Sequence, residues 1–108
     1  MQLLVQVYCR GTGSLRNRMA GDRQLEKYRL WVEKEQTPGR KPGWMKLQST
    51  GRVRRGAINV EWDADAKLLT CRVITRVGRP AGIVGDLVSY LLARHHRRIK
   101  AILVLPSV

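Results

Sequence analysis

Arginine and lysine are the side chains of this sequence best placed to do chemistry, because they far outnumber the acidic ones. Lysine and arginine total 21 against 8 aspartates and glutamates, which gives a formal net charge of +13. Most of these cations are arginines, whose planar guanidinium matches phosphate and carboxylate groups. A GC-rich genome would also favour arginine over lysine, but it would not explain the shortage of acids. Because self-repulsion of this size costs stability, the charge predicts a polyanionic partner.

The cations gather on one face of a predicted strand and in two predicted turns, 36–43 and 49–56, which we expect to lie at opposite ends of the sheet. Six of them, and no acid, lie between residues 36 and 60. Arg72 and Arg76 have the parity opposite to Cys71 and Val73, so they point away from the predicted core. Such a surface could follow a phosphate backbone, although a solvated outer face is the simpler interpretation. The residues predicted to contact nucleic acid are Arg16, Arg18, Arg40, Lys41, Arg52, Arg54, Arg55, Arg72 and Arg76.

The acids and histidines form no convincing catalytic set. Asp65 and Lys67 have the two-residue spacing with which some nucleases hold magnesium and activate water. However, Asp63 and Asp65 lie in a predicted turn, where aspartate side chains bond to turn amides. His95 and His96 are adjacent on a predicted helix, about 100° apart, so they cannot easily share one metal. We therefore predict no catalytic residue.

The cysteines and glycines do not complete a metal or cofactor site either. Cys9 and Cys71 have no second cysteine within zinc-ligand spacing, and we expect both to be buried, reduced thiols. The segment Arg10–Ser14 contains Gly11 and Gly13 after a strand, but it lacks the lysine and the third glycine of phosphate-binding loops. We therefore expect no cofactor and no metal.

Hydrophobic periodicity indicates the elements that must position these residues. Alternation of apolar and polar side chains predicts strands, and a stripe of apolar residues at helical spacing predicts one main helix that starts near Pro80. The segment 10–23 is predicted as a short helix capped by Ser14 or as a mobile basic loop. The predicted strands are 2–9, 26–35, 44–48, 57–62, 67–77 and 99–105, and the helix spans about 80–97.

These elements predict a single α+β domain over residues 1–108. We expect a mixed or antiparallel sheet of five to six strands, in which the four strands from 26–35 to 67–77 form a meander, with the helix packed on one face. The helix should connect its flanking strands in parallel, by a right-handed crossover. Residues 99–105 are nearly all apolar, which predicts a central strand covered on both faces.

The function that fits these observations is a non-enzymatic module that binds DNA or RNA through its phosphates. One alternative is an assembly subunit, which would meet an acidic protein or form a homodimer through its apolar helix or an edge strand. A second alternative is a small ribonuclease that uses the acids and histidines named above. No apolar run reaches the ~20 residues of a membrane span, so we expect no membrane partner and a cytoplasmic location.

Overall fold

A computed structural model describes residues 2–50, 56–76 and 80–106 of this chain. No helix among these residues is long and apolar enough to cross a membrane. The elements in chain order are β1 (Gln2–Cys9), α1 (Leu15–Ala20), the 3₁₀ helix η1 (Arg23–Tyr28), β2 (Leu30–Lys34), β3 (Met45–Ser49), β4 (Ala57–Asp63), β5 (Leu68–Ile74), α2 (Ala81–His95), the 3₁₀ helix η2 (His96–Arg98) and β6 (Ile99–Pro106).

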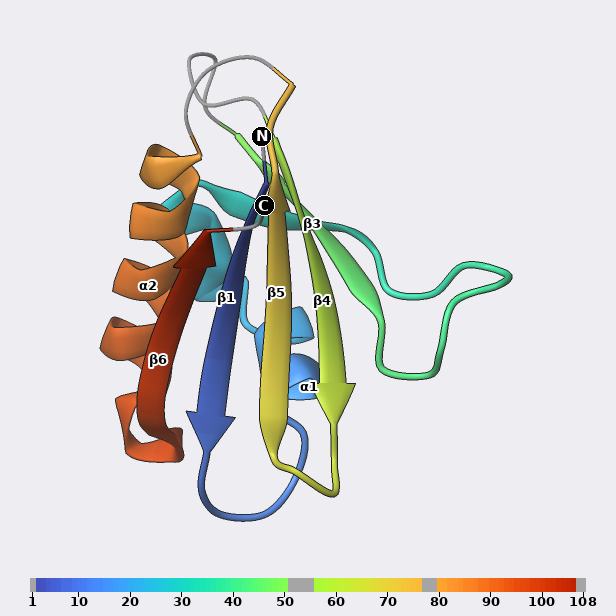
Figure 1. Ribbon diagram of the computed structural model, residues 1–108, viewed down its shortest axis with the longest axis vertical. Coiled ribbons are helices and arrows are strands. Elements are labelled where there is room, and N and C mark those ends of the chain that lie inside the picture. The colour runs from blue at the N-terminus through green and yellow to red at the C-terminus, as the bar shows by residue number, and fades with distance from the viewer. Residues whose placement is uncertain (1, 51–55, 77–79, 107–108) are drawn as a thin grey trace.

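The strands form one six-stranded sheet in the order β2-β3-β4-β5-β1-β6, and all neighbouring strands are antiparallel. Strands β2 to β5 are the predicted four-strand meander, and β1 inserts between β5 and β6. Because β5 and β6 both run antiparallel to β1, they are parallel to each other, and α2 connects them (Figure 1). The predicted α+β fold with one main helix is therefore confirmed.

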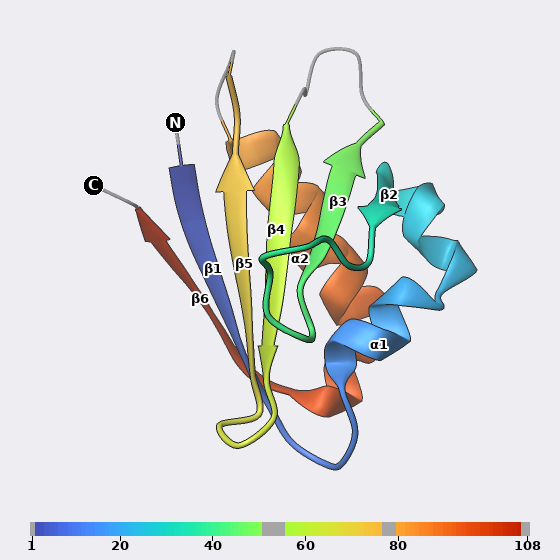
Figure 2. The ribbon, with the colours of Figure 1, turned by 90° about the vertical axis from the view of Figure 1, so that its right-hand side faces the viewer.

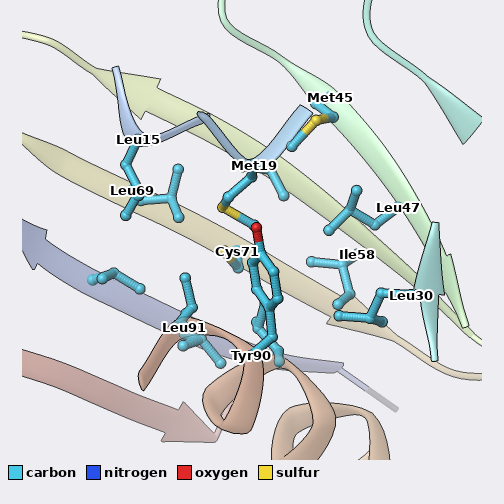
Figure 3. Packing of buried hydrophobic residues seen from close by; sticks show 14 of the residues in the cluster. Leu15, Met19, Leu30, Met45, Leu47, Ile58, Leu69, Cys71, Tyr90 and Leu91 are labelled. Atoms are coloured by element: carbon cyan, nitrogen blue, oxygen red, sulfur yellow. The ribbon is translucent and has the colours of Figure 1, made fainter. Parts of the chain in front are cut away.

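The helices bury their apolar side chains against one face of the sheet. Figure 2 shows α2 behind the strands and α1 beside their lower ends. Val5 and Cys71, which face each other on β1 and β5, are fully buried, as are Leu87 and Leu91 of α2. Tyr90 reaches from α2 into the middle of this cluster (Figure 3). Burying each such side chain stabilises the fold by ~1.5–3 kcal/mol, so this face holds the core.

The segment before β2 differs from the prediction. A strand was expected over residues 26–35, but its first part forms η1, and β2 begins only at Leu30. The Asp22 carboxylate caps η1 by accepting a hydrogen bond from the Gln24 amide, and Arg29 ends it with a left-handed φ of 65°. Earlier in the chain, the short helix predicted within residues 10–23 forms as α1, and Ser14 caps it by accepting a hydrogen bond from the Asn17 amide. Local capping therefore outweighs the alternation of charged and apolar side chains here.

The last strand is not central, as predicted, but lies at the edge of the sheet. β6 pairs with β1 on one side only, and most of its side chains are exposed. Ile99 is buried and Ile102 packs against the core, whereas Leu103 and Val104 remain 45% and 43% exposed. An unbroken apolar run predicts burial on both faces, but here the helices cover only one face of the sheet.

We expect both cysteines to resist alkylation by iodoacetamide while the protein is folded. Cys9 and Cys71 are free and buried. Burial raises the pKa of Cys71 to about 12 and also raises that of Cys9, and only the thiolate is a good nucleophile. Mass spectrometry should show labelling at mildly alkaline pH only after unfolding in guanidinium chloride. Labelling of the native protein at the rate of a free thiol would contradict this burial.

Candidate nucleic-acid interface

The face of the sheet opposite the helices, called the outer face below, carries polar and charged side chains. Arg72 of β5 pairs with Asn59 of β4, and Asn59 pairs with Lys46 of β3, so these three residues form one row across the strands. Arg72 is exposed, as its parity predicted, and its guanidinium donates to Oε1 of Gln2. The outer face therefore places a cation on β3 and another on β5.

The loop between β2 and β3 encloses a hollow against this face. Figure 2 shows residues 35–44 crossing in front of β4 and β3. The hollow has a volume of about 600 Å³, and outer-face residues such as Asn59 form its floor. No acidic side chain is found among the described residues that line it. The cations that line it are Lys34, Arg40, Lys46 and Arg76.

These cations differ in how much the surrounding protein neutralises them. Lys46 forms a salt bridge of 3.2 Å with Glu33. Hydrogen bonds from Gln48 and Lys46 lower the pKa of Glu33, so this carboxylate stays charged. The Arg40 guanidinium lies 5.1 Å from the ring centre of Trp44, a cation–π contact. Within the described chain, neither Arg40 nor Arg76 contacts a carboxylate.

Arg16 is not a surface contact but a buried clamp on this loop. It was predicted to bind nucleic acid, yet the residue is only 7% exposed. Its Nη2 donates to the carbonyl oxygen of Glu35 at 2.6 Å and to that of Trp44 at 3.0 Å. These two residues stand at the two ends of the loop. Arg16 therefore ties the loop ends together and so helps to position Arg40.

The other predicted contact residues are divided between the outer face and other places. Lys41 lies on the same loop and shares a second, smaller hollow with Arg40. Arg18 is exposed on α1, in the helical layer, and does not line the hollow. Arg52, Arg54 and Arg55 lie outside the residues that the structure describes.

Two of the four cations of the hollow, Lys34 and Lys46, were missed as site residues. Lys46 lies between Met45 and Leu47, both fully buried, so strand parity alone places it on the outer face. Lys34 could not be placed in this way, because the β2–β3 register shifts between Val32 and Lys34. Sequence alone also placed the turns at 36–43 and 49–56 at opposite ends of the sheet. Arg40 and Arg76 nevertheless line the same hollow. The turn at 36–43 belongs to the β2–β3 loop, and this loop bends back over the strands.

A second polar cluster ties α2 to η1 on the helical side. Tyr90 donates to Oδ2 of Asp22 at 2.9 Å, and Arg94 donates to both carboxylate oxygens of Asp22. Burial alone would raise the pKa of Asp22, but hydrogen bonds from Arg94, Gln24 and Tyr90 hold it below its ordinary value. His95 Nε2 lies 2.8 Å from the Tyr90 hydroxyl. Since the Tyr90 hydroxyl donates its hydrogen to Asp22, its oxygen can accept a hydrogen bond from Nε2–H of His95. This cluster therefore holds two helical segments together.

The acids considered for a nuclease site serve the β4–β5 turn. Oδ1 of Asp63 accepts hydrogen bonds from the amides of Asp65 and Ala66, as the turn interpretation predicted. None of the four nuclease candidates, Asp63, Asp65, His95 and His96, lines the hollow. The described residues contain no group of three or more metal-ligating side chains.

Comparison with known protein families, with curated proteins and with solved structures finds no match for this chain. The function must therefore be argued from the geometry of the described residues. The hollow on the outer face gathers four cations around a space of about 600 Å³, which is large enough for a ligand.

We expect Arg16→Lys to destabilise the protein and to loosen the loop. A lysine cannot reproduce the guanidinium fork, so a carbonyl of Glu35 or Trp44 would lose its partner, at a cost of about 1–3 kcal/mol. Urea unfolding should report this loss, and hydrogen exchange should accelerate at the Arg40 and Trp44 amides, which bond within the loop.

Arg18→Lys on the same helix is the matched control. Arg18 is exposed, so this change should alter the free energy of unfolding by less than about 0.5 kcal/mol. Equal effects of the two substitutions would show that Arg16 does not act as a clamp.

We expect stability to fall as the pH drops below the ordinary histidine pKa of 6.5, because of His95. Burial lowers the pKa of His95 despite the opposing attraction of Asp22. The unfolded chain therefore takes up a proton at a pH where the folded chain does not, which favours unfolding by at most about 1.4 kcal/mol per pH unit. Urea titrations at several pH values give the free energy of unfolding as a function of pH. The slope of this dependence below pH 6.5 should be smaller for His95→Gln than for the wild type. His96→Gln, at an exposed neighbour, should keep the wild-type slope, and the same slope in all three proteins would refute this assignment.

Proposed function

We propose that this protein binds nucleic acid through its phosphates, in the hollow of the outer face. The observation that supports this most is the convergence of four cations, from β2, the β2–β3 loop, β3 and the end of β5, around one space. The described residues that line this space include no carboxylate, and Glu33, which lies outside the lining, forms a salt bridge only with Lys46 among these four cations. Cations arranged in this way attract an anion that can contact several of them at once.

The strand register adds a second reason to expect an anion here. Lys34 of β2 and Lys46 of β3 are direct partners in the β2–β3 ladder. Like charges that face each other across a ladder are destabilising, and the one salt bridge to this pair among the described residues is that of Glu33 with Lys46. An anionic ligand in the hollow would relieve the repulsion, so binding and local stability should increase together.

The cationic surface also continues beyond the hollow, which favours a polymer over a small anion. Arg72 extends the row of Asn59 and Lys46 by one strand, and Lys41 follows Arg40 on the loop. A chain of regularly spaced phosphates can engage several of these cations together and release their counterions. An acidic protein would have to match the same spacing with carboxylates, and it is the alternative that the experiment below distinguishes.

The shape of the hollow favours a single strand. Its volume of about 600 Å³ is in the range of sites that hold one small molecule, and a flexible strand can bend a nucleotide into it. The rigid backbone of a duplex cannot enter a concave site of this size. Phosphate contacts do not distinguish RNA from DNA, so we expect similar affinities for the two single strands.

We expect the affinity for a single-stranded oligonucleotide to depend strongly on salt and on the cations of the hollow. Four phosphate contacts predict a slope of about −2.8 for log affinity against log salt, or about a 50-fold loss between about 50 and 200 mM. The double variant Arg40→Gln and Arg76→Gln should reduce that slope by about 1.4. Fluorescence anisotropy with a labelled oligonucleotide, and with the matching duplex, would measure both effects.

The control is Arg23→Gln with Arg97→Gln, two exposed arginines of the helical layer. It removes the same charge, so it should leave the slope close to that of the wild type. An equal loss in both double variants would mean that net charge, and not the hollow, attracts the ligand. A binding constant insensitive to salt would overturn the proposal, and binding only to an acidic protein would favour the alternative.

A further inference from the structure

The two edges of the sheet differ in ways that matter for association. β2 has only five residues, carries Glu33 and Lys34, and has a register shift, all features that discourage pairing with another strand. β6 has eight residues, and Lys100 is its one charged side chain. Its register irregularity is confined to the pairing of Cys9 with Ile99, so residues 101–105 run regularly along β1. β6 is therefore the edge that is open to another strand.

Apart from Lys100, the exposed side chains of β6 are apolar, and they lie on both faces of the sheet. Leu103 and Leu105 pair with Gln6 and Leu4, which places them on the outer face, and they are 45% and 37% exposed. Val104 pairs with the buried Val5, which places it on the helical face, yet it is 43% exposed. A long apolar edge of this kind is normally covered in a soluble protein.

We propose that a second copy of this chain covers this edge, with the two β6 strands paired antiparallel and the two sheets joined into one. If the two-fold axis passes at Leu103, Ile102 faces Val104 of the other copy and Ala101 faces Leu105. Lys100 then faces Pro106, so no like charges meet. In such an isologous pair the same strand of both copies meets, so apolar side chains of one copy lie beside apolar side chains of the other on each face of the sheet.

The distribution of charge favours a second copy over an acidic partner. An acidic protein would seek the cations, but β6 offers it only Lys100. The net charge of +13 opposes self-association in general, yet the basic hollows would lie far apart in this dimer. They sit over β3 and β4, so seven to nine strand spacings separate them, roughly 34–43 Å at ~4.8 Å per strand. That distance exceeds the Debye length of ~10 Å at 0.1 M salt, so the repulsion is screened.

The geometry of the pair also has a consequence for the outer face. A two-fold axis perpendicular to the sheet keeps both helical layers on one side and both hollows on the other. An interface one strand wide is small, so we expect a dissociation constant on the order of micromolar. The proposal concerns β6 alone and does not depend on what the hollow binds.

Sedimentation of nuclease-treated protein at high salt tests this, since both conditions remove any bridging nucleic acid. We expect the 12.3 kDa chain to shift from monomer to dimer as its concentration rises. Leu103→Lys should weaken the dimer at least tenfold, because two lysines would meet at the axis. Trp31→Lys is the matched control, since it adds the same charge at a residue 42% exposed on the opposite edge. It should leave the dimer intact.

A second variant tests the pairing directly. Leu103→Cys should form a disulfide-linked dimer on mild oxidation, because directly opposed residues of antiparallel strands have Cα atoms about 4.5–5.5 Å apart. The native cysteines are buried and should not compete. A wild-type chain that stays monomeric at high concentration would overturn the proposal. So would a dimer that Trp31→Lys disrupts and Leu103→Lys does not, since that would place the contact on β2.

Discussion

The architecture depends on the fact that helices cover only one face of a six-stranded sheet. The inward side chains of β1, β4 and β5 meet α1 and α2 and form the core. The outer face has no helix against it, so the polar and charged side chains over β3, β4 and β5 can meet a ligand. β6 is left as an apolar edge, because Ile99 and Ile102 pack with the core whereas Leu103, Val104 and Leu105 remain exposed.

Two acidic residues hold the helical side together. Asp22 joins η1 to the end of α2 through Arg94, and Asp86 of α2 pairs with Arg29 at 3.2 Å. The Asp63 carboxylate accepts a hydrogen bond from the Asp65 amide in the turn between β4 and β5. At the hollow, Glu33 pairs with Lys46, and no described carboxylate contacts Arg40 or Arg76. The overall charge is therefore less informative than the positions at which the fold gathers several cations around one space.

Arg16 shows how a buried charge can serve the surface without reaching it. It bridges the carbonyls of Glu35 and Trp44, so the loop between them starts and ends at fixed points. Arg40 is held in turn against the Trp44 ring. Without these contacts, the conformational entropy of a long loop would favour many conformations over a single one. One guanidinium in the core thereby helps to shape a hollow on the other side of the sheet.

The sequence by itself determined the meander, the main helix, the inward parity of Cys71 and Val73 and the outward parity of Arg72. These features follow from periodicity within a single element, which records the face on which each side chain lies. Only the tertiary structure decided that Arg16 is buried, that Arg40 and Arg76 line one hollow, and that β6 is an edge. Each of these depends on segments far apart in the chain, and an apolar run shows that a strand avoids water without showing which neighbour covers it.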